Sequence, residues 1–284
     1  MSTSTPDPDE QRALEILEAA LADSPAGERA RIIKSFVLAA MGAIPWVGGF
    51  LGAMASIKSD EDKSRTRNIQ IQWLEEHSTK INSLHQTLAE VIRRFESLGE
   101  QIDERIQSEE YLNLVRKAFR VWDRSDTEEK RSTIRNLIAN AAGTRVCSDD
   151  VVRLFIDWLA AYHEAHLAVI RHIYSHRGTT RYDIWTAVYG DVPREDSAEA
   201  DLFRLLIRDL STGGVIRQAR DTDYDGRFLR REGPTKRAKG SRVTESSFEN
   251  TKPYVLTELG SQFVHYALTE STRRIEAATT PDPT

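Results

Sequence analysis

The sequence predicts a mostly α-helical protein that ends in a small domain containing both helices and strands. Apolar residues recur at helical spacing through most of the 284 residues, and a seven-residue repeat runs from residue 74 to 102, whereas short strand-like runs occur only after residue 214. We expect a disordered end at 1–8, N-terminal helices with an apolar hairpin at 9–62, a coiled-coil helix at 63–107, a helical bundle at 108–165, an α+β domain at 166–270, and a disordered tail at 271–284.

Composition narrows the class of protein. Hydrophobic residues make up 39% and charged residues 29% of the chain, which is enough apolar material for a core with a well-solvated surface. The formal net charge of -5 gives no overall attraction to nucleic acid or anionic lipid. The single cysteine, Cys147, excludes a disulfide framework within the chain, and no signal peptide is visible. We expect a cytoplasmic protein, with membrane association as an open alternative.

An uncharged segment at residues 35–57 is the most informative feature of the sequence. Its 23 residues contain no charge and match the roughly 20 apolar residues that span a bilayer. Pro45, Gly48 and Gly49 interrupt it, and each residue type disfavours a helix interior. Two half-helices of roughly 15 Å each would be too short to span a bilayer separately, so the hairpin either packs inside the protein or inserts shallowly. The membrane-contact candidates are Phe36, Leu38, Ile44, Pro45, Trp46, Val47, Gly48, Gly49, Phe50 and Leu51.

A heptad seam follows the apolar segment. Apolar residues at a and d positions continue over about four repeats, with His77 and Arg105 as polar interruptions near its two ends. The pattern predicts self-association through a coiled coil. The residues of the seam are Leu74, Ile81, Leu84, Leu88, Val91, Phe95, Leu98 and Ile102.

The C-terminal region has the element order of a known module. Helices are expected near residues 167–175, 180–189 and 197–210, the third with Leu202, Leu205, Leu206 and Leu210 inward. A strand, a long polar loop, a second strand and a last helix follow. The characteristic residues are Leu205, Gly213-Gly214-Val215-Ile216 and Tyr254-Val255-Leu256-Thr257-Glu258-Leu259-Gly260. This run resembles a winged helix-turn-helix module, which implies a winged-helix domain with a long basic wing that binds nucleic acid or a protein.

Charge in this region argues against sequence-specific DNA binding. Residues 195–210, which include the third helix, carry Glu195, Asp196, Glu199, Asp201 and Asp209 against only Arg204 and Arg208. The wing, residues 217–242, has nine Lys or Arg residues and four acids, so it is either a solvated loop or a contact to the phosphate backbone without sequence reading. The nucleic-acid candidates are Arg227, Arg230, Arg231, Lys236, Arg237 and Lys239.

The patterns that could indicate metal binding favour other interpretations. His163, His166, His172 and His176 lie in one helical stretch without the spacing of a zinc protease, and we interpret them as polar rim residues and one packed core histidine. Asp221, Asp223 and Asp225 begin like a calcium loop, but flanking helices are not predicted and a turn is favoured. We expect no metal, no cofactor and no catalytic residues, and therefore a protein that is not an enzyme.

A second resemblance bears on biological role. The helix layout and small-residue pattern are similar to the bacterial abortive-infection alpha family, which is linked to phage defence. The similarity runs through Lys130, Arg131, Leu137-Ile138-Ala139-Asn140-Ala141, Val152, Phe155, Ile156, Leu159, His166, Leu167, Ile170, Ile173 and Tyr174. The leading hypothesis is a non-enzymatic effector that oligomerises, responds to a protein trigger and acts on membranes through residues 35–57. Alternatives are a winged-helix binding module with a buried apolar segment, and a coiled-coil scaffold.

Overall fold

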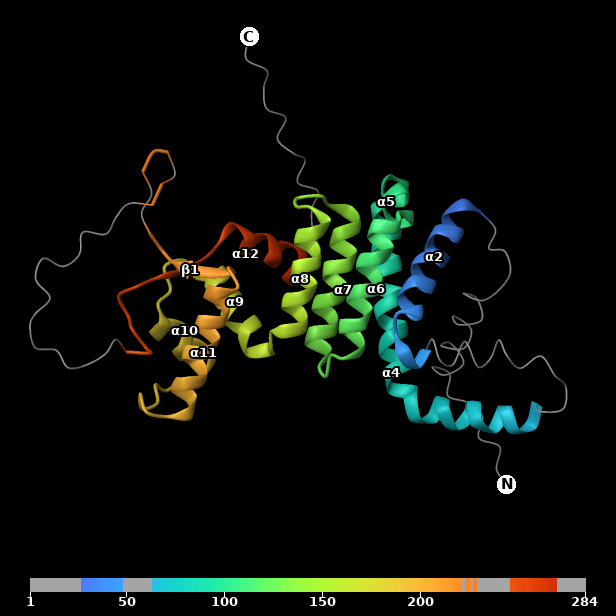
Figure 1. Ribbon diagram of the computed structural model, residues 1–284, viewed down its shortest axis with the longest axis horizontal. Helices are drawn as coiled ribbons and strands as arrows, with labels where there is room; N and C mark the ends of the chain where they lie inside the picture. The colour runs from blue at the N-terminus through green and yellow to red at the C-terminus, as the bar shows by residue number, and fades with distance from the viewer. Residues whose placement is uncertain (1–26, 48–62, 221–222, 226, 229–245, 270–284) are drawn as a thin grey trace, which may run out of the picture. The chain divides into compact units, whose positions relative to one another are not determined.

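The computed structural model describes residues 27–47, 63–220, 223–225, 227–228 and 246–269 (Figure 1). The predicted disordered ends, 1–8 and 271–284, lie outside these residues. The chain divides into unit 1, Met1–Ala160 with Thr269–Thr284, and unit 2, Ala161–Leu268. The prediction of a mostly helical fold with a small sheet is confirmed.

Unit 1 is helical throughout its described part. Its α-helices are α2 (Glu28–Gly42), α4 (Lys63–Leu98), α5 (Asp103–Gln107), α6 (Glu109–Asp123), α7 (Glu128–Gly143) and α8 (Asp149–Ala161), with a 3-10 turn, η2 (Glu100–Ile102). Helix α6 packs between α2 and α7, and α4 packs against α7 (Figure 1). Ser108 and Thr127 begin α6 and α7 because their hydroxyls accept the N–H groups of Tyr111 and Lys130.

The apolar segment enters the core of unit 1. Helix α2 ends at Gly42, and Pro45 starts the next helical turn, where the missing N–H of proline does no harm. The Phe36 ring is completely buried, 5.0 Å from the Phe95 ring and 6.4 Å from the Phe119 ring between centroids. The described half of the predicted hairpin therefore packs inside the protein. Its second half lies outside the described residues.

The long helix is shorter than the sequence predicted. Helix α4 ends at Leu98, not at residue 107, because Gly99 adopts a φ of 74°, a left-handed conformation that terminates helices. The seam residues Ile81, Leu84, Leu88, Val91 and Phe95 are buried in unit 1, as is Ile102 in η2. From Ile81 onward the seam thus belongs to this chain's own core, and self-association through the rest of it stays a prediction.

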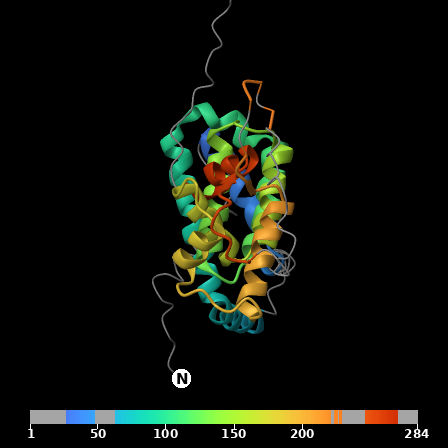
Figure 2. The same ribbon diagram turned by 90° about the vertical axis from the view of Figure 1, so that its left-hand side faces the viewer.

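The described part of unit 2 contains four α-helices, a π-helical turn and a two-stranded sheet (Figure 2). They are α9 (Glu164–Ser175), α10 (Arg181–Val188), α11 (Ala198–Thr212), β1 (Ile216–Gln218), β2 (Tyr254–Leu256), α12 (Glu258–Phe263) and η3 (Val264–Leu268). The strands are antiparallel, with Gln218 opposite Tyr254. The Tyr254 N–H donates to the Thr179 carbonyl at 2.8 Å, so the segment between α9 and α10 also pairs with β2.

The inward face of α11 differs from the prediction. Phe203, Leu206, Ile207 and Leu210 are buried, whereas Leu202 and Leu205 are 46% and 39% exposed. The expected inward positions of Leu202 and Leu205 are therefore wrong. Phe203 and Ile207, four residues apart, set the buried face, which rotates Leu202 and Leu205 toward solvent.

The Thr257–Gly260 part of the winged-helix-like run closes the sheet onto α12. The Thr257 hydroxyl accepts the Gly260 N–H at 2.9 Å and donates to the Gly214 carbonyl at 2.6 Å, and the Thr257 N–H donates to the Val215 carbonyl at 2.9 Å. Any Cβ on Gly260 would lie 2.1 Å from the Val215 oxygen. The close packing of α12 on the Val215 carbonyl therefore requires a capping threonine at position 257 and a glycine at position 260.

Candidate functional site

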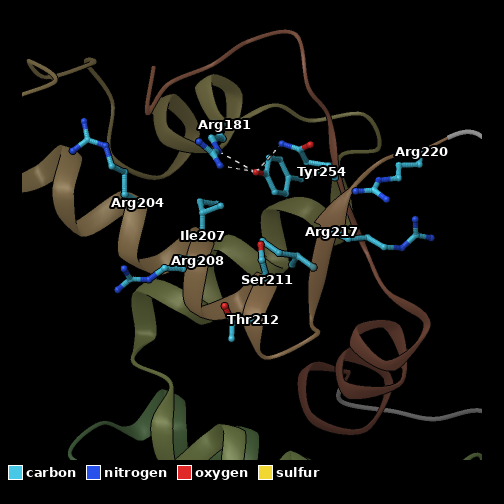
Figure 3. Close-up of a pocket in the computed structure, with 11 residues that line it drawn as sticks. Arg181, Arg204, Ile207, Arg208, Ser211, Thr212, Arg217, Arg220 and Tyr254 are labelled. Atoms are coloured by element: carbon cyan, nitrogen blue, oxygen red, sulfur yellow. Dashed lines mark hydrogen bonds between the residues drawn. The ribbon is translucent and has the colours of Figure 1, made fainter. Parts of the chain in front are cut away.

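Unit 2 contains a groove of about 560 Å³ whose lining, among the described residues, includes five arginines and no carboxylate (Figure 3). We call it the arginine groove. Its lining residues are Arg181, Arg204, Ile207, Arg208, Ser211, Thr212, Ile216, Arg217, Gln218, Arg220 and Tyr254. The chemistry of this lining is that of an anion-binding site.

Three structural elements supply the arginines. Arg204 and Arg208 lie four residues apart on α11 and so project from one side of that helix (Figure 3). Arg217 lies on β1 and Arg220 follows that strand. Arg181 is the first residue of α10, whose start is defined by a capping box between Thr180 and Asp183. Elements far apart in the sequence therefore create one positive surface.

Arg181 and Tyr254 are joined by hydrogen bonds within the groove. The Arg181 Nε and Nη2 groups donate to the Tyr254 phenolic oxygen at 3.0 and 2.8 Å (Figure 3). The Arg181 guanidinium also lies 5.5 Å from the Tyr254 ring centroid. Tyr254 is only 3% exposed and its backbone is held by Thr179. Arg181 is thus oriented by a neutral partner, which leaves its positive charge uncompensated.

The acidic residues near α11 pair with two of the five groove arginines, Arg204 and Arg208. Burial opposes ionisation of Glu195, but hydrogen bonds from Ser246, Ser247 and Arg204 outweigh it and lower the pKa of Glu195 to about 2. Asp201 also pairs with Arg204, and Asp209 lies 3.9 Å from the Arg208 Nε. Within the described residues, Arg181, Arg217 and Arg220 form no ion pair with a carboxylate. The groove therefore keeps a net positive charge.

Arg227 is the described member of the predicted nucleic-acid candidates. It is exposed, and its N–H donates to the Asp223 carboxylate at 2.8 Å. The Asp223 carboxylate also accepts the Asp225 N–H at 3.0 Å, which fits the predicted turn. The other candidates, Arg230, Arg231, Lys236, Arg237 and Lys239, lie outside the described residues. The sequence alone does not single out the groove arginines, because they lie on separate elements that only the folded chain brings together.

The membrane candidates occupy contrasting positions in unit 1. Phe36, Ile44 and Val47 are buried, whereas Pro45 is exposed and Leu38 is 40% exposed. The half-buried Trp46 donates its indole N–H to Asp123 at 2.7 Å. Gly48, Gly49, Phe50 and Leu51 lie outside the described residues. No helix in the described part of the chain has the length and apolarity needed to cross a bilayer.

Among the four clustered histidines, His166 is the packed core residue. It is 5% exposed and stacks on Tyr162 at 5.0 Å between ring centroids, and its Nδ1 accepts the His163 N–H at 3.1 Å. Burial lowers the pKa of His166, and the Asp209 carboxylate, 3.8 Å from its Nε2, opposes this shift without reversing it. His172 hydrogen-bonds Thr179. The described residues contain no metal-binding group of His, Cys, Asp or Glu.

Comparison with known protein families, curated proteins and solved structures found no match for this chain.

Proposed function

We propose that unit 2 is a winged-helix binding module whose arginine groove binds the phosphate backbone of nucleic acid. The observation that carries the proposal is the convergence of five arginines on one groove that has no carboxylate among its described lining residues. Planar guanidinium groups donate paired hydrogen bonds that match the geometry of phosphate oxygens. The groove therefore suits a polyanion more than a neutral or cationic ligand.

The arrangement of unit 2 supports the winged-helix part of this proposal. Three helices, α9, α10 and α11, precede β1, and β2 returns to pair with both β1 and the Thr179 segment. The chain between β1 and β2 occupies the place of a wing. In such modules the third helix and the wing contact nucleic acid together, and the arginine groove lies between α11 and β1.

The proposed binding reads the backbone and not the base sequence. Contacts to phosphate fix the position of a protein on nucleic acid but carry little sequence information. Glu195 and Asp201 pair with Arg204, which reduces its attraction for phosphate. The overall charge of -5 further limits nonspecific attraction at a distance. We therefore expect affinity that depends strongly on salt and weakly on sequence.

The arginine groove can be tested by removing three of its charges together. The full-length variant Arg208→Ala/Arg217→Ala/Arg220→Ala should bind a fluorescent DNA duplex more weakly than the wild type. If each arginine contacts one phosphate, each lost contact should reduce the magnitude of the slope of log affinity against log salt by roughly 0.9. The loss of three contacts should therefore reduce it by about 3. Fluorescence anisotropy over a series of salt concentrations measures both quantities.

A matched control keeps the same change in net charge. Arg93, Arg120 and Arg124 are exposed arginines of unit 1 without a hydrogen bond or ion pair among the described residues. Their triple alanine variant should retain the affinity and salt slope of the wild type. Equal losses in both triple variants would mean that general charge and not the groove binds DNA, and the proposal would then be wrong.

The membrane-active defence effector is a second proposal. It is supported by the 23 uncharged residues at 35–57 and by the exposed Leu38 within them. Phe36 and Ile44 are buried, so the segment that carries them must leave the core of unit 1 before these side chains can reach lipid. Membrane activity should therefore need a protein trigger and self-association.

Flotation with anionic liposomes tests the membrane proposal. The folded protein should remain unbound, and mild urea that loosens unit 1 should move it into the lipid fraction and cause dye leakage. The variant Leu38→Asp, at an exposed position, should fold normally but lose this triggered binding. Absence of lipid binding by the wild type under every condition would contradict the proposal.

A further inference from the structure

Phe228 is an apolar ring placed among the positive charges at the strand side of the arginine groove. It is 51% exposed. The Arg217 and Arg220 guanidinium groups lie over its ring, at 4.7 and 6.0 Å from the centroid. An exposed aromatic ring is not needed to hold a core, and the half of its surface that stays open lies beside two cations, which suits a ligand that is both aromatic and anionic.

The local backbone holds this ring in place. The Asp223 carboxylate accepts the N–H groups of Asp225 and Arg227, and the Asp223 N–H donates to the Arg227 carbonyl at 2.9 Å. Phe228 follows directly after this turn. The fully exposed Tyr224 lies within the same turn, so a second aromatic side chain is presented close by in the chain.

The two arginine–aromatic pairs of the site differ in what they can do. Tyr254 is buried and its phenol is already hydrogen-bonded to Arg181, so its ring cannot stack on a ligand. Phe228 forms no such polar contact and about half of its surface is open. Arg217 and Arg220, which have no carboxylate partner among the described residues, can bind phosphate while Phe228 contacts an adjacent base.

We propose that Phe228, with Arg217 and Arg220, is a stacking platform for unpaired bases, so that the arginine groove prefers single-stranded nucleic acid. This inference rests on the proposed nucleic-acid function of the groove. Bases of a duplex are stacked on each other inside the helix and do not offer a face to Phe228. Bases of a single strand do, and stacking on an aromatic ring tolerates any base sequence.

The test uses the full-length protein with a fluorescent oligothymidine of about 15 nucleotides and a duplex of equal length. Phe228→Ala should weaken binding of the single strand by about 5- to 150-fold, the range expected for loss of one stacked base, and should weaken duplex binding much less. Phe228→Trp should restore single-strand affinity because it restores a stacking surface. Tyr174→Ala, at a 59% exposed tyrosine on α9, is the matched control and should bind both probes normally.

Three outcomes would overturn the inference. Unchanged single-strand affinity in Phe228→Ala, together with loss of binding in the triple arginine variant, would refute the stacking platform but leave the proposed function intact. Equal weakening for single strand and duplex would mean that Phe228 only supports the shape of the groove. Absence of wild-type binding to both probes would refute the platform and the proposed function together.

Discussion

Replacing Phe36 with alanine is expected to lower the free energy of unfolding of unit 1 by about 3–5 kcal/mol. The Phe36 side chain is completely buried and meets Phe95 and Phe119 edge to face. Alanine would remove these contacts and leave a cavity between α2 and its neighbours, which rigid helices fill only in part. Urea unfolding followed by tryptophan fluorescence measures the loss.

Leu38→Ala is the control for Phe36→Ala. It lies two residues further along α2 but is 40% exposed, so it should cost far less than the Phe36 variant. Similar losses for the two variants would mean that α2 does not dock into unit 1 through its Phe36 face. That result would remove the reason for requiring a trigger in the membrane proposal.

Replacing Gly260 with alanine is expected to destabilise unit 2 by about 1–3 kcal/mol. The new Cβ would lie 2.1 Å from the Val215 oxygen and 3.0 Å from its carbonyl carbon. That carbonyl cannot move freely because it accepts the Thr257 N–H. In an ordinary helix interior the same change stabilises by about 1 kcal/mol, so the sign of the effect is diagnostic. Thermal unfolding followed by circular dichroism measures it.

Gly42→Ala is the matched control for Gly260→Ala. Gly42 is also helical, but no atom lies within 4 Å of the position of an added Cβ. This variant should be as stable as the wild type or slightly more stable. If Gly260→Ala were also neutral, α12 would not pack tightly against the Val215 carbonyl, and the structural reason for the Thr257–Gly260 pattern would be lost.

Features set by nearby residues were predictable from the sequence. The interruption of the apolar segment near Pro45 follows from proline, and the last helix begins at Thr257, within the run that the sequence marked. The termination of α4 at Gly99 was not predictable from the sequence, because a glycine in a helical pattern is compatible with either continuation or a break.

The partner of an apolar surface was not predictable in the same way. The heptad seam from Ile81 to Phe95 has the spacing of a coiled coil, yet it packs in unit 1, where α4 lies against α7. The same spacing suits a partner helix from another chain or from this one. Hydrophobic burial is nondirectional, so periodicity defines which face is buried but not what buries it.

The sequence by itself therefore determined the helical class of the protein, the break in the apolar segment and several of the helix ends. These depend on backbone conformation and hydrogen bonds within a few residues. Only the tertiary structure decided that Phe36 and Ile44 face a protein core, and that Arg181, Arg208 and Arg217 from three separate elements line one groove. Such groupings depend on long-range packing, which brings together charges from elements that are separate in the sequence.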